Sequence, residues 1–389
     1  MQPLTRLASA LLILGLAACS GPTAEVPGPT PIMTPGVALQ RDSPMPPAPS
    51  PLATATVEAA PSATAAPPSP TAAPSATAAP PSPTAEPYPD LAQYTIEGLR
   101  ARSYGEGTIE IVRVLEERAE FTRYLIAYPS DGLRITGMLN RPRGDGPFPV
   151  VILNHGYYPL DAYVTGNGTQ RAADYLAARG FLTLSPDFRS HAGSDDAPNV
   201  FRAGHVIDTL NLIPLAQALP EALPGKVLMW GHSNGGAITA KAIAVSDEIA
   251  AALIYAPASS NIVEDYQFRV ERWARRAGQP PGRRQGVIDR LEIEFPVTPD
   301  QAPDLYARLS PLGAAQYVSA RVLIIWGDQD ETVPRKWPED LYRALRDAGK
   351  DVAFEVFPGQ PHSFDAEGNA RYLPMMEAFF RETLGGTSR

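Results

Sequence analysis

The sequence has a single cysteine, Cys19, among 389 residues, and this scarcity excludes disulfide bonds within the chain. Basic residues are also too few to balance the acidic ones: 33 Lys and Arg face 42 Asp and Glu, which gives a formal net charge of −9. This balance argues against nucleic acid or an anionic membrane surface as a partner of the folded part. The chain has no glycine-rich phosphate loop and no dinucleotide fingerprint, so we expect no bound cofactor.

Long hydrophobic runs are scarce as well, and the most informative one is N-terminal. Residues 7–18 are almost entirely apolar but too few to span a bilayer, and Arg6 supplies a positive charge just before them. Residues 1–18 are therefore typical of a signal peptide. They end in Leu-Ala-Ala followed by Cys19, which resembles the bacterial lipobox, in which the cysteine is lipidated and becomes the mature N-terminus. We predict an exported protein that is attached to a membrane only through lipidated Cys19.

Proline is abundant, and much of it lies in the segment that follows. Residues 19–89 consist largely of Pro, Ala, Thr and Ser, and 61–73 and 74–86 are near-identical repeats of thirteen residues. Such a composition cannot bury a core and favours extended, solvated chain. We predict a disordered stalk over 19–89, with the folded domain in 90–389.

The folded part is organised around residues 227–236. Four apolar residues predict a short buried strand, and Gly231-His232-Ser233-Asn234-Gly235, which fits G-x-S-x-G, leads into a predicted helix over 237–244. A serine at a sharp strand-to-helix turn has its hydroxyl exposed, and only glycine at 231 and 235 lets the two arms pass closely. Ser233 is therefore the candidate nucleophile; the simpler alternative is a Gly-Ser turn in which Ser233 caps the helix.

Strands and helices alternate through most of the domain. Strands are predicted over 108–114, 121–128, 133–139, 148–153, 181–184, 227–230, 249–255, 321–326 and 352–356, and helices over 169–179, 202–219, 237–244, 338–348 and 372–384. The first three strands form an antiparallel start, and the later apolar strands suit a parallel sheet that is buried on both faces. The sequence therefore predicts an α/β fold with a mostly parallel central sheet and helices on both faces.

One connection is longer than a crossover requires. More than sixty residues separate the strands 249–255 and 321–326. Helices are predicted there over 263–277, 286–295 and 303–309, with a basic loop at 278–284. We predict a helical cap insertion at about 259–316 over the active site; the alternative is a helical excursion on the flank.

A serine nucleophile needs a base, and the base needs an acid that fixes its tautomer. Of the five histidines, His362 follows the last predicted strand, where a loop returns to the strand ends at which the serine turn opens. The acid should follow the strand 321–326, where Asp328, Asp330 and Glu331 are all candidates.

The oxyanion of the reaction needs two hydrogen-bond donors. One is the backbone N–H of Asn234, directly after the nucleophile. The other is the backbone N–H of Tyr157, which follows Asn154-His155-Gly156 at the end of a buried strand. A plain strand-to-loop turn is the alternative for this second segment.

The loop after residue 186 contains four potential metal ligands close together in the sequence. They are Asp187, His191, Asp195 and Asp196. Their spacing fits no familiar ligand pattern and no second cluster accompanies them, so no metal is expected. The loop is interpreted as structural, with Asp187 and Arg189 as a potential pair.

Taken together, these motifs resemble the α/β-hydrolase superfamily, nearest to its prolyl-oligopeptidase and dienelactone-hydrolase-like branch. The matching segments are 135–139, 149–156, 186–189, 231–236, 309–311, 327–334 and His362 with Phe364. The resemblance covers residues from about 120 to the end and implies a triad of Ser233, Asp330 and His362, with Asp330 selected by the family spacing. It also implies Tyr157 and Asn234 as oxyanion donors.

The resemblance is a poorer guide to the substrate. Prolyl oligopeptidases carry a β-propeller before the hydrolase domain, and this chain has only the stalk and a few strands there, which favours an esterase for small carboxylic esters. The runner-up is a peptidase for short peptides, in which Glu264, Asp265 or Glu271 of the insertion would hold an α-amine. A catalytically inactive hydrolase fold that serves as a surface binding module is a third possibility.

Overall fold

The computed structural model describes residues 88–274 and 290–385. The predicted signal peptide, Cys19, nearly all of the predicted stalk and the basic loop of the insertion lie outside this part of the chain. Within the described residues, no helix is long and apolar enough to cross a bilayer.

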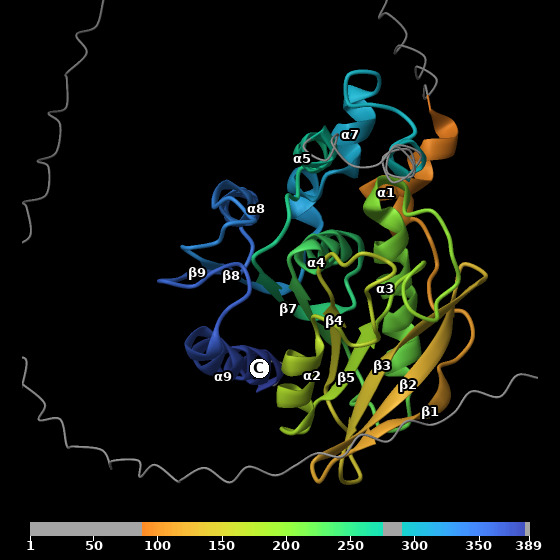
Figure 1. The fold of residues 1–389 in the computed structure, drawn as a ribbon, viewed down its shortest axis with the longest axis vertical. Helices are drawn as coiled ribbons and strands as arrows, with labels where there is room; N and C mark the ends of the chain where they lie inside the picture. The colour runs from red at the N-terminus through yellow and green to blue at the C-terminus, as the bar shows by residue number, and fades with distance from the viewer. Residues whose placement is uncertain (1–87, 275–289, 386–389) are drawn as a thin grey trace, which may run out of the picture. The chain divides into compact units, whose positions relative to one another are not determined.

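A nine-stranded sheet forms the centre of the described part (Figure 1). Its strands are β1 (Glu110–Glu117), β2 (Phe121–Ser130), β3 (Leu133–Pro142), β4 (Val150–Asn154), β5 (Leu182–Pro186), β6 (Val227–His232), β7 (Ile249–Tyr255), β8 (Arg321–Gly327) and β9 (Val352–Phe357). They lie in the order β1-β2-β3-β5-β4-β6-β7-β8-β9. The pairs from β1 to β5 are antiparallel, and all pairs from β5 to β9 are parallel. The predicted mostly parallel sheet with an antiparallel start is confirmed.

Helices cover both faces of the sheet because the central strands are apolar on both sides. On one face lie α2 (Gln170–Ala177) and α9 (Ala366–Gly385), and on the other α1 (Ile96–Arg100), α3 (Ala203–Gln217), α4 (Asn234–Val245) and α8 (Lys336–Asp347). Successive strand residues alternate between the two layers: Val151 and Leu153 pack with α2 and α9, whereas Ile152 packs on the opposite side. This alternation explains why these strands read as unbroken apolar runs in the sequence.

The folded part begins close to the predicted end of the stalk. The short helix η1 (Pro89–Tyr94) leads into α1, which the sequence analysis did not predict. Thr95 caps α1 by accepting a hydrogen bond from the backbone N–H of Gly98 at 3.0 Å. Ile96 and Leu99 are fully buried in the core next to α4, so this five-residue helix is held by packing and not by its intrinsic helix propensity.

The connectivity of the sheet sets the position of the site. β4 pairs with β5 on one side and with β6 on the other, so the chain leaves β4 in one direction and later continues in the opposite one. At such a switch point the loops that follow neighbouring parallel strands diverge and leave a crevice at the carboxyl ends of the strands. The loops after β4 and β6 contain residues 155–158 and Ser233.

The insertion between β7 and β8 has a small hydrophobic core of its own. Its described elements include α5 (Ile262–Ala274), α7 (Pro303–Leu309) and η3 (Pro311–Tyr317), and α5 and α7 lie above the sheet in the view of Figure 1. Phe295 and Tyr306 of the insertion pack edge-on against Phe201 of η2 (Val200–Arg202), at centroid distances of 6.0 and 5.6 Å. The insertion is therefore packed against the segment that leads into α3.

Candidate active site

Ser233 lies at a tight turn between β6 and α4. Its φ of +57° is a conformation that side-chain-bearing residues rarely adopt, and its backbone N–H is held by the carbonyl of Tyr255 at 2.9 Å. A Cβ atom on Gly235 would lie 2.0 Å from the carbonyl oxygen of Asn154, and one on Gly231 would lie 2.1 Å from the carbonyl oxygen of Gly235. Both positions therefore exclude any side chain, which is the requirement that the sequence pattern predicted.

The structure brings Ser233, His362 and Asp330 together from three separate loops. His362 Nε2 lies 3.0 Å from Ser233 Oγ, and His362 Nδ1 lies 2.8 Å from Asp330 Oδ2. The other carboxylate oxygen of Asp330 accepts the backbone N–H groups of Thr332 and Val333 at 2.8 and 2.7 Å. Asp330 is thus fixed at both oxygens and can hold the imidazole with Nε2 directed at the serine hydroxyl.

The two other acids of this loop have different partners. Asp328 accepts the backbone N–H of Gly359 at 2.6 Å, and Glu331 accepts the backbone N–H of His362 at 3.4 Å. Neither hydrogen-bonds to the imidazole of His362. Both instead hold the backbone of the loop that carries His362.

His232, the residue before the nucleophile, also holds this loop. Its Nε2 donates to the backbone carbonyl of His362 at 3.0 Å, and its ring lies between Tyr255 and His362, at centroid distances of 4.3 and 4.7 Å. Burial, and the neighbouring His362, lower the pKa of His232 to about 4, so the ring is neutral at pH 7 and has one N–H to donate. The contact joins residues 130 positions apart, and the G-x-S-x-G pattern leaves this position open.

The backbone segments that carry Tyr157 and Asn234 both lie next to the nucleophile, and both residues line the same cavity as Ser233. α4 begins at Asn234, so the first N–H groups of this helix have no carbonyl partner within it. The loop after β4 passes so close that a Cβ on Gly156 would lie 3.4 Å from Ser233 Cβ. Within residues 88–274 and 290–385, the N–H of the next residue, Tyr157, donates no hydrogen bond. These are the two donors that the sequence predicted for an oxyanion.

His155 holds the loop after β4 in place through both ring nitrogens and its ring face. Its Nδ1 lies 2.7 Å from the carbonyl oxygen of Gly156, its Nε2 lies 3.2 Å from that of Asp187, and its ring stacks on Tyr163 at 4.4 Å. The side chain is buried, and this burial lowers its pKa to about 4. His155 is thus neutral and held by neighbouring groups, and it does not contact Ser233.

The proposed pairing of Asp187 with Arg189 is wrong. Asp187 is buried and accepts the hydroxyls of Thr136, Thr165 and Tyr163 at 2.6, 2.7 and 3.0 Å. Burial raises its pKa to about 6. Arg189 instead forms a buried ion pair with Asp208 of α3 at 2.8 Å. The reason is local: Phe188 has a φ of +62°, which turns the side chains on either side of it in different directions.

The other three potential ligands of this loop are also engaged elsewhere, and His191 Nδ1 lies 3.1 Å from the carbonyl oxygen of Arg189. Asp195 accepts the backbone N–H of Arg134 at 2.7 Å, and Asp196 accepts the hydroxyl of Ser190. No group of three or more potential ligands that could hold a metal ion occurs in the described part of the chain.

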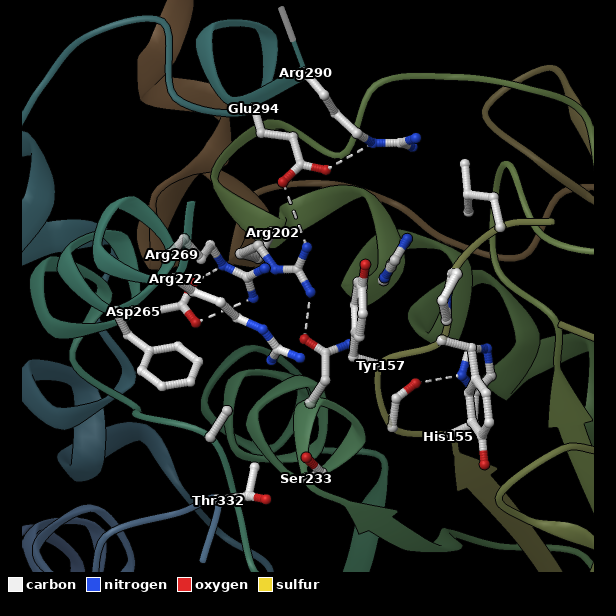
Figure 2. Close-up of a pocket in the computed structure, with 18 of the residues that line it drawn as sticks. His155, Tyr157, Arg202, Ser233, Asp265, Arg269, Arg272, Arg290, Glu294 and Thr332 are labelled. Atoms are coloured by element: carbon white, nitrogen blue, oxygen red, sulfur yellow. Dashed lines mark hydrogen bonds and ion pairs between the residues drawn. The ribbon is translucent and has the colours of Figure 1, made fainter. Parts of the chain in front are cut away.

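A cavity of about 470 Å³ lies over Ser233 (Figure 2). Its apolar lining comes from the loop after β4, the insertion, the loop before α8 and the first turn of α8, and includes Tyr157, Tyr158, Phe268, Leu291, Val333 and Trp337. Of the three acids considered for binding an α-amine, Asp265 alone lines the cavity, and its carboxylate is held by Arg269 at 2.8 and 3.1 Å. Glu264 is bound by Lys336 outside the cavity, and Glu271 is not part of the lining.

Comparison with known proteins points to hydrolases. The model of the prolyl oligopeptidase family matches residues 287–387, and that of the X-Pro dipeptidyl-peptidase (S15) family matches residues 131–287. Each of the two matches covers less than half of the chain.

Individual relatives include peptidases and esterases. The chain is 22% identical over 260 residues to the uncharacterized peptidase YtmA of Bacillus subtilis, covering 66% of this chain and 93% of that protein. It is 26% identical to dipeptidyl aminopeptidase BIII of Pseudoxanthomonas mexicana, covering 64% of this chain but 35% of that protein. Acetyl xylan esterase 1 from Thermoanaerobacterium sp. JW/SL YS485 superposes with a TM-score of 0.54 at 18% identity, over 76% of this chain and 92% of that one.

These findings agree with the architecture described above. The fold is that of the α/β-hydrolases, and the chain is a serine hydrolase, either an esterase or a peptidase.

Proposed function

We propose that this serine hydrolase cleaves carboxylic esters of modest size through an acyl-enzyme on Ser233. The observation that carries the proposal is the hydrogen-bonded chain from Ser233 through His362 to Asp330 at the floor of a largely apolar cavity. A binding module would not need these three side chains to be hydrogen-bonded to one another in this order.

In the proposed mechanism, His362 removes the proton of the Ser233 hydroxyl as the oxygen attacks the ester carbonyl. The backbone N–H groups of Tyr157 and Asn234 stabilise the negative charge that develops on the carbonyl oxygen. His362 then returns the proton to the departing alcohol. A water molecule, activated by the same imidazole, releases the acid and restores the serine.

The charges in the cavity favour an ester over a peptide with a free N-terminus. A peptidase that holds an α-amine needs an available carboxylate, and Asp265 is instead engaged on both oxygens by Arg269. Substrate recognition through a cation would therefore have to break this pair, at a cost that an uncharged ester avoids.

The direct test is hydrolysis of a panel of chromogenic acyl esters beside aminoacyl and dipeptidyl anilides by the full chain. Ester turnover that Ser233→Ala abolishes, with little anilide turnover, is the expected result. Anilide turnover at rates comparable to ester turnover would overturn the esterase assignment in favour of the peptidase, which the similarity to a dipeptidyl aminopeptidase supports. A folded protein that cleaves neither class would contradict both.

We also propose that the protein is exported and held at a membrane by a lipid on Cys19, with residues 19–89 acting as a stalk. The supporting features are the apolar N-terminal run and the lipobox-like ending at the chain's only cysteine. Expression of the full chain with Cys19→Ser should move the protein from the membrane fraction to the soluble fraction and leave its specific activity unchanged. Membrane association that persists in the variant would refute the lipid anchor.

A further inference from the structure

One wall of the cavity is lined by guanidinium groups. Among the described residues that line it are Arg202, at the end of η2, Arg269 and Arg272 on α5, and Arg290 of the insertion. Figure 2 shows Arg202, Arg269 and Arg272 gathered on one side of the cavity above Ser233 in this view. Apart from this wall, the lining is mainly aromatic and aliphatic.

The carboxylates around these groups are too few to balance them. Asp265 is bound by Arg269, and Glu294 is shared between Arg202 at 3.5 Å and Arg290 at 3.4 Å. A third carboxylate, Asp161, lies on the exposed part of the loop after β4. Four guanidinium groups thus face three carboxylates, and the described lining carries one positive charge in excess.

Arg272 is the guanidinium group without a carboxylate partner in the described part of the chain. Its Cζ lies 5.6 Å from the ring centroid of Tyr157, which is the predicted oxyanion donor and lines the cavity with Ser233. The contact orients the guanidinium group but leaves its N–H donors free for a ligand. Its position over Tyr157 puts it at the edge of the reaction site.

Arg202 approaches the nucleophile from another direction. Its side chain is largely buried, and its Nη2 donates to the side-chain oxygen of Asn234, the residue directly after Ser233. Beneath it, the buried Lys241 donates to the carbonyl oxygen of Phe201 at 3.4 Å, and burial lowers the pKa of this lysine to about 7. Arg202 therefore places a positive charge next to the reaction site itself.

We propose that the substrate is an ester that carries a second, ionised carboxylate, and that Arg272 and Arg202 bind this group. The inference rests on the proposed esterase activity and names its substrate class. A guanidinium group presents paired N–H donors that match the two oxygens of a carboxylate, and one such group balances the single excess charge. The apolar lining suits the short hydrocarbon chain between the two carbonyl groups of a dicarboxylic acid monoester.

The experiment compares three 4-nitrophenyl esters of matched length with the full chain. The acyl groups are adipate with a free carboxylate, adipate with the distal carboxylate methylated, and 6-aminohexanoate, each corrected for spontaneous hydrolysis. A charge-assisted hydrogen bond predicts a kcat/KM for the free carboxylate about 10- to 100-fold above that of the methyl ester. The amine should be the poorest substrate of the three. Equal values, or a preference for the amine, would overturn the proposal while leaving the esterase activity in place.

Arg272→Gln provides the specific variant, because its removal leaves no carboxylate unpaired in the described residues. It should lower kcat/KM for the free carboxylate about 10- to 100-fold more than for the methyl ester. Arg113→Gln, on the exposed edge strand β1 and outside the cavity lining, is the matched control. It should leave unchanged the ratio of kcat/KM for the free carboxylate to kcat/KM for the methyl ester. A ratio that is equally insensitive to both substitutions would refute the role of Arg272.

Binding separates this proposal from the esterase proposal. Titration calorimetry of adipate into the Ser233→Ala protein should detect binding that weakens in Ser233→Ala/Arg272→Gln, with 1,6-hexanediol as the uncharged control. If no ester is turned over but adipate still binds in this way, the proposed function fails and the carboxylate site stands. If esters are turned over but adipate binds no better than the diol, the carboxylate site fails and the proposed esterase function stands.

Discussion

Acidification from pH 7 to pH 5 should destabilise the protein by about 2 kcal/mol, because buried histidines outweigh a buried aspartic acid. His155 and His205 are both buried, and burial lowers the pKa of His155 from 6.5 to about 4 and that of His205 well below 6.5. Each is neutral in the folded protein and takes up a proton on unfolding. Their stabilising contribution is therefore present above pH 6.5 and is lost as the pH falls toward 4.

The size of this stability loss follows from the pH interval over which each group titrates. At 1.36 kcal/mol per pKa unit, a histidine whose pKa falls from 6.5 to about 4 on folding, as those of His155 and His232 do, loses about 1.8 kcal/mol of stability between pH 7 and pH 5. Asp187 acts in the opposite sense, since its pKa is raised from 3.8 to about 6 and the folded state takes up the proton first. Its protonation returns about 1.3 kcal/mol over the same interval, so His155 and His232 against Asp187 leave a net loss of about 2 kcal/mol, and His205 acts in the same direction as the other two histidines.

The assay is urea unfolding of the full chain at the two pH values, with the midpoint and slope fitted together. His205→Phe is the informative variant, since the His205 ring stacks on Phe188 at 4.8 Å and a phenyl ring can keep this contact without titrating. The variant should lose less stability than the wild type on acidification, because it lacks a buried group that takes up a proton on unfolding. A wild-type stability that is constant or rises toward pH 5, or a variant with undiminished pH dependence, would refute the reasoning.

Three further predictions concern the site. Gly235→Ala should lower the free energy of unfolding by about 2 kcal/mol or more in thermal or urea unfolding, because the added Cβ meets a backbone oxygen at 2.0 Å; unchanged stability would contradict the tight turn. Asp330→Asn should lower kcat about 10³- to 10⁴-fold in ester hydrolysis, whereas Asp328→Asn should cost about tenfold or less, and equal losses would reassign the acid. His232→Phe should keep the ring packing but remove the hydrogen bond to the His362 carbonyl, lowering kcat about tenfold with little change in KM; a change confined to KM would argue against positioning of His362.

Much of the fold could be predicted because it depends on signals that are local in the sequence. The strand β7 and the helix α7 have the predicted bounds, and the other predicted strands differ by a few residues at their ends. In these elements, apolar runs and turn residues decide the conformation without help from distant contacts. The short helix α1 escaped prediction because five residues carry no periodic signal, and burial of Ile96 and Leu99 by distant parts of the chain holds it in place.

The site shows the same division. Ser233 and His362 could be proposed from a motif and from a position after a strand, whereas the acid stayed open among three residues until the family spacing selected one. His232 contacts the loop of His362, and Arg202 contacts Asn234. Both contacts join segments that are adjacent in space but separated in the sequence, so no local pattern predicts them. The pairing of Arg189 depends on a backbone in which both its neighbours, Phe188 and Ser190, have a positive φ, which no sequence pattern predicts for a phenylalanine.

The left-handed backbone of Ser233 has a consequence for engineering. A residue held at such a φ stores about 1–3 kcal/mol of conformational energy, which glycine would not. Directed evolution that selects only for heat resistance would thus favour variants in which glycine replaces the nucleophile. Thermostable variants of this chain should accordingly be sought with turnover as a second, simultaneous criterion.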